Sequence, residues 1–216
     1  MKYMIVYAAA VFLFSCYQTG SDQTISNDSL AVSTTDSFKP VPGTDSAPEN
    51  DSTLLFRKAT EILSAVKKGN YQSFAGFIHP QLGTRFSPYA YIDTVKDKKL
   101  LANEFIALEK QNKKINWNSA FSEDTELLNV KEYFAKFVYD VDFINAELKS
   151  LNKFHSQGTD LNNIQDVYPQ NNIVEFFFPG FDKKYDGMDF RGLRLVFKMQ
   201  DKIPYLVGVV HDKWTP

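Results

Sequence analysis

The chain is short of the residue types on which most catalytic and metal-binding motifs depend. It has one cysteine, Cys16, in 216 residues, so it can form neither an internal disulfide nor a CxxC-type metal site. Three histidines are present, and none of them stands in an HExxH pattern. GxSxG and phosphate-cradling glycine loops are missing as well. These absences exclude the serine hydrolase, zincin and P-loop classes, and we expect no cofactor and no metal.

Charge and aromatic content narrow the class further. The formal net charge is -2, whereas a nucleic-acid groove needs a clear basic surplus, so no nucleic-acid partner is expected. Nineteen phenylalanines and eleven tyrosines predict an aromatic-rich core, because aromatic side chains bury the most surface each.

The first sixteen residues have the layout of an export signal. Lys2 supplies a positive start, and residues 5–14 form an unbroken apolar run. That run is too short to cross a bilayer, which needs about twenty residues. The residues Leu13-Phe14-Ser15-Cys16 resemble the lipobox of bacterial lipoproteins, with Phe14 in place of the more usual small or aliphatic residue.

The lipobox resemblance implies a lipid anchor. Residues 1–15 would be the signal peptide, and Cys16 would become the mature N-terminus and carry acyl chains. The membrane would then be a partner through the anchor, and the protein would lie in the bacterial cell envelope, periplasmic or surface-exposed. The alternative is an ordinary cleaved signal followed by an incidental cysteine.

A composition break follows the cysteine. Residues 17–50 are mainly Ser, Thr, Asp, Asn and Pro, with isolated apolar residues and no period. Such a segment buries too little apolar surface to offset its ordering entropy, so it predicts a disordered linker. The expected organisation is a signal peptide at 1–15, a lipidated cysteine and linker at 16–52, and a globular domain at 53–216.

Apolar periodicity predicts helices in the first two thirds of this domain. Gly69 suits the end of the first helix, Asp97 could cap the third, and Asn129 with Glu132 resembles a capping box at the start of the fourth. The predicted helices are Thr53–Lys68, Tyr71–Ile78, Lys98–Leu108 and Val130–Val138, with Leu148–Phe154 and Leu161–Val167 as shorter candidates.

The last forty residues predict an antiparallel sheet. Asn172–Phe178, Arg191–Met199 and Pro204–His211 alternate as strands and are separated by turn residues. The third strand is apolar on both faces, so it should be central or covered on both sides. The fold class is therefore α+β, with N-terminal helices packed on a curved C-terminal antiparallel sheet.

Two stretches carry candidate functional side chains. Residues 81–93 predict an irregular loop with an arginine and several aromatics, a composition typical of ligand surfaces; an aromatic loop folded onto the core is the alternative. Asp140 and Asp142 would share a face if residues 139–143 are extended, and could then bind a cation or share a proton. Two solvated carboxylates are the alternative.

The order of helices and strands resembles the nuclear transport factor 2-like (NTF2-like) cone, a fold that serves both enzymes and binding modules. The domain also resembles one found in uncharacterised bacterial secreted proteins and lipoproteins, and this likeness implies no established activity. It is carried by the segments Ile78-His79-Pro80 with Gly83, Arg85-Phe86-Ser87-Pro88-Tyr89, Phe137-Val138-Tyr139-Asp140 with Asp142-Phe143, Phe178-Pro179-Gly180, Tyr185-Asp186-Gly187-Met188-Asp189 and Leu206-Val207-Gly208-Val209-Val210-His211-Asp212-Lys213-Trp214-Thr215.

Three functions remain open at this point. The leading one is a non-enzymatic envelope module that binds a small molecule, a glycan or an envelope protein. Its candidate ligand-binding residues are His79, Arg85, Phe86, Tyr89, Tyr91, Arg191 and Arg194. The alternative is an NTF2-like enzyme in which Asp140 or Asp142 forms a general acid–base pair with His211. A purely structural lipoprotein, with an exposed apolar patch, is the third.

Overall fold

The structure is a computed structural model that describes residues 49–117, 126–155 and 162–214. These residues lie within one compact unit, Ser46–Pro216. The helical elements are α1 (Asp51–Lys67), α2 (Tyr71–Ala75), α3 (Ala102–Lys110), α4 (Val130–Phe137), η1 (Phe143–Asn145), α5 (Ile164–Val167) and η2 (Lys183–Tyr185). The strands are β1 (Thr84–Ser87), β2 (Lys98–Leu100), β3 (Ile115–Asn116), β4 (Leu127–Leu128), β5 (Leu148–Leu151), β6 (Asn172–Phe178), β7 (Arg191–Gln200) and β8 (Ile203–Lys213).

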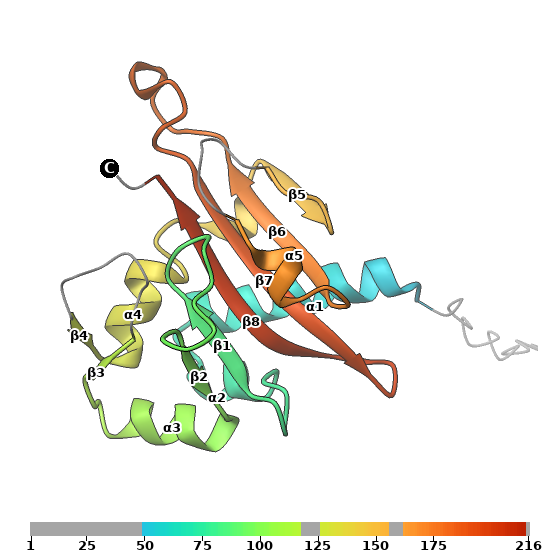
Figure 1. The fold of residues 1–216 in the computed structure, drawn as a ribbon, viewed down its shortest axis with the longest axis vertical. Helices are drawn as coiled ribbons and strands as arrows, with labels where there is room; N and C mark the ends of the chain where they lie inside the picture. Colours follow the sequence, from blue (N-terminus) through green and yellow to red (C-terminus); the bar gives the residue numbers. More distant parts are fainter. Residues whose placement is uncertain (1–48, 118–125, 156–161, 215–216) are drawn as a thin grey trace, which may run out of the picture. The chain divides into compact units, whose positions relative to one another are not determined.

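A six-stranded curved sheet runs through the centre of this unit (Figure 1), in the order β2-β1-β8-β7-β6-β5. β1 pairs with β8 in parallel, and the other neighbours are antiparallel. The predicted α+β class is confirmed, and so are the three C-terminal strands. β8 has a neighbour on each side, as its two apolar faces predict.

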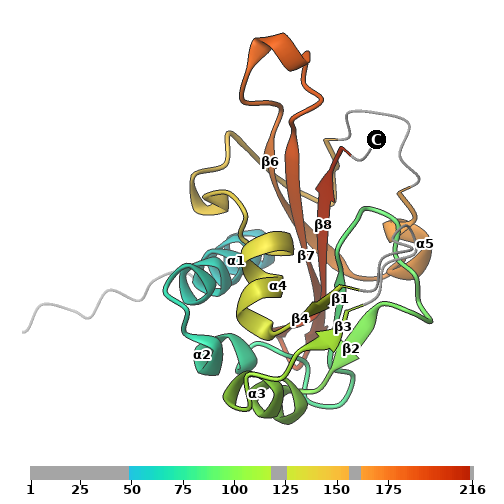
Figure 2. The ribbon, with the colours of Figure 1, turned by 90° about the vertical axis from the view of Figure 1, so that its left-hand side faces the viewer.

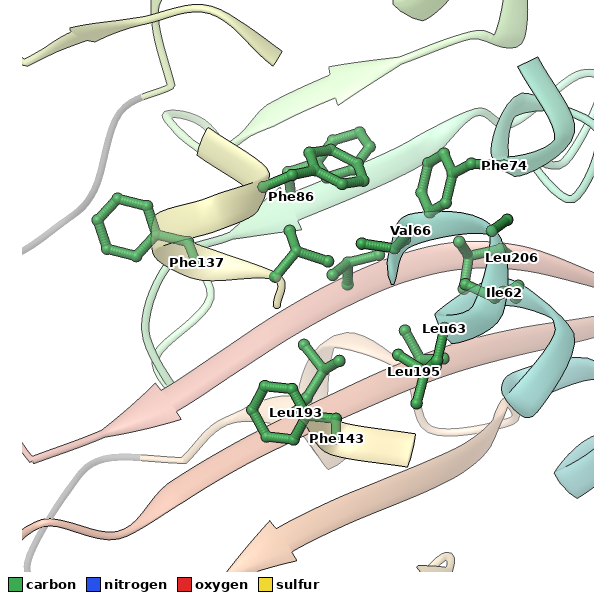
Figure 3. Packing of buried hydrophobic residues seen from close by; sticks show 14 of the residues in the cluster. Ile62, Leu63, Val66, Phe74, Phe86, Phe137, Phe143, Leu193, Leu195 and Leu206 are labelled. Atoms are coloured by element: carbon green, nitrogen blue, oxygen red, sulfur yellow. The ribbon is translucent and has the colours of Figure 1, made fainter. Parts of the chain in front are cut away.

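The first four α-helices pack on one face of the sheet, as Figure 2 shows for α1, α2 and α4. Leu193 and Leu195 of β7 point into this layer, where they meet α1 and η1 (Figure 3). Aromatic rings fill the space between α2, β1, α3 and α4; Phe74 lies 5.0 Å from Phe134 and 5.1 Å from Phe105, centroid to centroid. This is the aromatic core that the composition predicts.

The opposite face carries a smaller apolar cluster beneath α5. Its fully buried members are Ile92, Ile164, Ile173, Val196, Val207 and Val210. α5 is short and covers little of this face. The rest of the face holds the charged side chains described below.

Two of the three predicted signals for helix ends are confirmed, whereas the predicted cap at Asp97 is wrong, because α3 begins at Ala102 after Leu101. Asn129 accepts a hydrogen bond from the Glu132 backbone N–H, and the Glu132 carboxylate accepts one from Asn129, so the predicted capping box is confirmed. Gly69 follows α1 with φ +64°, the left-handed conformation expected of it. The start of α1 differs slightly, because Asn50 rather than a later residue caps it, through Thr53 N–H at 2.8 Å.

Two predictions around β1 are wrong. Residues 84–87 form a strand instead of an irregular loop, because they pair with β8; the hydroxyl of Thr84 also donates to the carbonyl of Leu206, 122 positions away. Lys98–Leu100 is the strand β2 rather than the first turn of a helix. The following helix begins at Ala102, and Glu104 accepts a hydrogen bond from Leu101 N–H at 2.8 Å.

Further corrections concern the segments around β5 and β8. Residues 148–151 form a strand that pairs with β6, not a helix. Residues 139–141 are bends and residue 142 is irregular, so this is not an extended segment, and η1 follows. The pairing of β7 with β8 shifts between Val196 and Phe197, so Val207 is an extra residue. This bulge breaks the strict alternation expected for β8.

The signal peptide, Cys16 and most of the predicted linker lie outside the described residues. Within the described ranges no helix is long and apolar enough to cross a membrane.

Candidate functional site

A basic pocket of about 290 Å³ lies where β1, β2 and the bulge of β8 meet the segment after α5. Its charged lining residues are Arg85, Lys99 and Lys198, and no carboxylate of the described residues lines it. The other lining residues are Leu82, Gly83, Thr94, Val167, Tyr168, Asn171 and Val207. Three cations around one small cavity make it suited to an anion.

Backbone carbonyls hold Arg85 in position. Its Nη1 donates to the carbonyl oxygens of Thr94 at 2.9 Å, Asp97 at 3.2 Å and Asp93 at 3.4 Å. These acceptors are backbone carbonyls, so they form no ion pair with the guanidinium. The Asp93 and Asp97 carboxyl groups still attract its charge, because Arg85 acts to lower the pKa of each. Among the described residues Arg85, Lys99 and Lys198 form no ion pair (the Lys99 and Lys198 side chains are exposed).

Two glycines permit the close packing that shapes the pocket. Gly83 has φ +70°, and a Cβ there would lie 2.6 Å from the carbonyl oxygen of Leu100. Gly208 lies under Tyr168, whose hydroxyl would be 2.9 Å from an added Cβ. Any larger residue at either position would push apart the two walls of the pocket.

Tyr168 and Asn171 contribute polar groups to the wall. The Tyr168 hydroxyl donates to the Val207 carbonyl at 3.4 Å, and the Asn171 side-chain amide donates to the Phe197 carbonyl at 3.2 Å. Burial raises the pKa of Tyr168 to about 12, although Arg85 opposes the rise through its charge and a hydrogen bond. The phenol therefore stays protonated and adds no negative charge to the pocket.

His79 lies near the two lysines but does not line the pocket. Its Nδ1 accepts backbone N–H groups from Gln81 and Leu82, both at 3.2 Å, which leaves the proton on Nε2. Nε2 is buried and has no partner among the described residues. Burial lowers the pKa of His79, and the charges of Lys198 and Lys99 lower it further, so the ring is neutral.

The structure brings Asp140, His211 and Arg191 together at the other end of β7 and β8. The Asp140 carboxylate lies 3.0 Å from Nε2 of His211 and 2.9 Å from Nε of Arg191. Burial favours a raised pKa for Asp140, but His211 and Arg191 outweigh it and the pKa is lowered. His211 is fully buried, with its ring against Phe137 and Phe143. Asp140 and His211 are in contact, as the members of an acid–base dyad are, but the imidazole is not exposed.

Asp142 is separate from this cluster. It forms an ion pair with Lys67 at 2.8 Å and accepts hydrogen bonds from Tyr139 and Asn145. Lys67 first, and then Tyr139, lower the pKa of Asp142 to about 2. The two aspartates do not share a face as the extended conformation would require. Across the described ranges no three His, Cys, Asp or Glu side chains are grouped to hold a metal ion.

Arg194 is an internal residue of the sheet. Its Nε donates to Glu175 at 2.8 Å, and its Nη2 donates to Asp212 at 2.6 Å. All three side chains are buried, and Arg194 and Glu175 are fully so. His155 contacts the second oxygen of Glu175 at 2.7 Å through its backbone N–H and 2.8 Å through Nδ1. This chain of charges crosses β6, β7 and β8.

Two aromatic residues of 81–93, Phe86 and Tyr89, pack inward. Phe86 is fully buried against Phe105 and Trp117, and Tyr89 packs on Phe137. Tyr91 is half-buried. The predicted candidates are thus divided between the basic pocket, the Asp140 cluster, the buried charge chain and the core, rather than gathered in one pocket.

Four other residues that line the pocket were not predicted from the sequence: Lys99, Lys198, Tyr168 and Asn171. Alternation along β7 does place Lys198 on the same face as Arg194 and would have been the usable signal. No protein-family model, curated protein or solved structure matches this chain.

Proposed function

We propose that this chain is a lipoprotein of the bacterial cell envelope, anchored through Cys16, whose folded head binds a small anionic ligand in the basic pocket. The proposal for the anchor rests on the lipobox resemblance at Leu13–Cys16. The proposal for the ligand rests on one observation, the three cations around a cavity that no carboxylate in the described part of the chain lines.

The cations favour a ligand with two or more negative charges. Arg85 can present a planar pair of donors to a carboxylate or phosphate group, and the two lysines add flexible point charges. The cavity of about 290 Å³ is at the lower end of ligand-pocket volumes, which suits a compact polyanion. Inorganic phosphate, a phosphomonoester or a small polycarboxylate has this chemistry.

The proposed architecture of the head is the NTF2-like cone. Helices that precede a curved sheet and pack on one of its faces support this assignment. The parallel pairing of β1 with β8 gives the site its position, because it brings Arg85 beside the bulge at Val207.

A binding test uses inorganic phosphate and citrate as probes at constant ionic strength. Both should raise the melting temperature of the chain, because a ligand that binds only the folded state stabilises it. The double variant Lys99→Gln with Lys198→Gln should weaken binding by about tenfold or more, as charge-assisted contacts are lost. Isothermal titration calorimetry measures the change.

A matched control has the same change in net charge. Lys68 and Lys131 are exposed and form no ion pair among the described residues, so Lys68→Gln with Lys131→Gln should bind both probes like the parent chain. Equal weakening in the two double variants would mean general charge attraction and would contradict the proposed pocket. The anchor is tested separately by incorporation of labelled palmitate, which Cys16→Ala should abolish.

The second candidate function is an enzyme with an Asp140–His211 acid–base pair, favoured by the 3.0 Å contact between them. General acid–base work needs the imidazole within reach of a substrate. The ring of His211 is enclosed by Phe137 and Phe143, so we rank this function below ligand binding. If a turnover is found, Asp140→Asn should abolish it, whereas Asp142→Asn should leave it intact.

A further inference from the structure

The loop between β6 and β7 exposes large apolar side chains where loop tips usually carry small or polar residues. Phe181, Tyr185 and Met188 of this loop are 55%, 44% and 50% exposed, and Trp214 at the end of β8 is 45% exposed. The loop projects past the ends of the strands (Figure 1, Figure 2). We call these four side chains the apolar tip.

Three members of the apolar tip line one shallow pocket. Tyr185, Met188 and Trp214 surround about 400 Å³ together with Asp189 and Arg191. The pocket joins the loop to the end of β8, so Tyr185, Met188 and Trp214 form one patch although Trp214 is distant in the sequence. Phe181 lies on the same loop and packs on Phe178.

The loop is held in a defined shape. The carboxylate of Asp189 accepts the backbone N–H groups of Phe181 at 3.0 Å and Asp182 at 2.8 Å. A Cβ on Gly180, which has φ +156°, would lie 2.9 Å from that carboxylate. These contacts fix the backbone of the loop that presents Phe181, Tyr185 and Met188, so little backbone ordering is needed for the three side chains to bind.

We propose that the apolar tip inserts into the interfacial region of a phospholipid bilayer. Tryptophan and tyrosine are the side chains that favour this region, and lysines flank them here at 183, 184 and 213. This inference is independent of the basic pocket and of acylation at Cys16. If the anchor exists, the tether raises the effective concentration of the tip at the membrane.

Area favours a bilayer over a stable protein interface. Half-exposed side chains of this size, which bury about 150–250 Å² each, present on the order of 400 Å² in total. A stable protein–protein interface needs roughly 800 Å² on each partner. A projecting patch of about half that area suits insertion into lipid, where no matching surface is needed.

Charge adds little to the attraction. Residues 179–191 contain three acidic and three basic residues, and Lys184 pairs with Asp182 at 2.9 Å. Apolar burial must then supply the attraction. We expect binding to zwitterionic vesicles as well as anionic ones, and only a weak dependence on salt.

The two tryptophans of the chain allow a direct test by fluorescence. Trp117 is 3% exposed and stacks on Tyr133 at 4.0 Å, so a change in emission on binding reports Trp214. The full chain with Cys16→Ala, which carries no acyl group, is mixed with phosphatidylcholine vesicles with and without phosphatidylglycerol. Emission should move to shorter wavelength with both, and Trp214→Phe should remove the shift.

Variants locate the contact. Phe181→Ser with Met188→Ser should lower the vesicle partition coefficient by about tenfold or more. Ile203→Ser is the matched control, because Ile203 is 47% exposed at the opposite end of β7 and β8; it should bind like the parent. Every variant retains the apolar run at residues 5–14, so any vesicle binding through that run is common to all of them. The variants are therefore compared by the change in emission of Trp214.

Three results would overturn the inference. One is an emission of Trp214 that vesicles leave unchanged. Another is an equal loss of partitioning in Ile203→Ser and in the loop variant. The third is a shift that requires anionic lipid and disappears in moderate salt, since that would indicate charge attraction through another surface.

Discussion

The two faces of the six-stranded sheet are both buried, but by different chemistry. The face toward α1, α2 and α4 is closed by apolar side chains such as Leu193 and Leu195. The face toward α5 has a small apolar cluster and, beside it, the buried chain of Glu175, Arg194 and Asp212. Neighbouring residues of β7 therefore enter environments of opposite polarity.

The difference shows where this fold tolerates charge. In the middle of the second face each cation is met by carboxylates, because a buried charge without a partner costs several kcal/mol. At the end of the same face Arg85 and Lys198 have no ion pair among the described residues and border the basic pocket. The paired charges stabilise the head, and the unpaired charges remain available to a ligand.

Removal of the central cation should have the largest effect. Arg194→Leu leaves the carboxylates of Glu175 and Asp212 buried without their guanidinium, and should lower the free energy of unfolding by about 4 kcal/mol. Urea denaturation measures this. A second variant that also replaces both carboxylates by leucine should recover most of the loss, because an apolar substitute for a buried ion network is often neutral. A cost below about 1 kcal/mol for Arg194→Leu would show that water reaches the chain of charges.

The next residue along β7 tests the other face. Leu195 is fully buried among the helices, and Leu195→Ala should lower the free energy of unfolding by about 3 kcal/mol through lost transfer energy and a residual cavity. No charge is involved, so the same loss is expected at pH 5 and pH 8. A loss that changed markedly between these pH values would contradict the contrast between the two faces.

The parts of the fold that could be predicted are those with local signals in the sequence. The signal for the capping box at Asn129 and the signal for strand β7 each lie within a short stretch of the sequence. Both elements are present as expected. β1 and β2 have no such local signal. Thr84 is in a strand because Leu206 and its neighbours lie beside it, and that pairing spans 122 positions. For a four-residue strand the partner decides the conformation, which propensity cannot reveal.

The residues of the candidate site likewise differ in whether the sequence alone reveals them. Arg85 could be selected from its unusual aromatic neighbourhood, and Asp140 with His211 from the chemistry of their side chains. Lys99 could not, because an exposed lysine on a strand has the pattern of a solvated residue. For Lys198, alternation along β7 indicates only the face of the sheet and not the pocket. Only the parallel pairing of β1 with β8, and the bulge at Val207, bring these cations around one cavity.

The last predicted effect has the opposite sign, a gain of stability, and concerns Asp97, a buried carboxyl on the charged face that forms no ion pair among the described residues. It accepts hydrogen bonds from the Ser87 hydroxyl at 2.5 Å and the Asp93 N–H at 3.0 Å, yet burial raises its pKa to about 6. The folded state then binds this proton more tightly than the unfolded state, whose carboxyl has a pKa of about 3.8. Its contribution to stability is present below about pH 4 and is lost as the pH rises to 6.

Asp97→Asn keeps an oxygen for both hydrogen bonds and removes the charge. The variant should gain about 3 kcal/mol in the free energy of unfolding at pH 7.5 and little at pH 4, since the pKa is raised by roughly two units and one unit corresponds to about 1.4 kcal/mol. Urea denaturation across this range measures the difference, and Asp186→Asn, on the exposed loop, serves as the control for loss of one negative charge. A gain that stayed constant with pH would mean that Asp97 is not the group that titrates, and that the second face accommodates an unpaired carboxylate without cost.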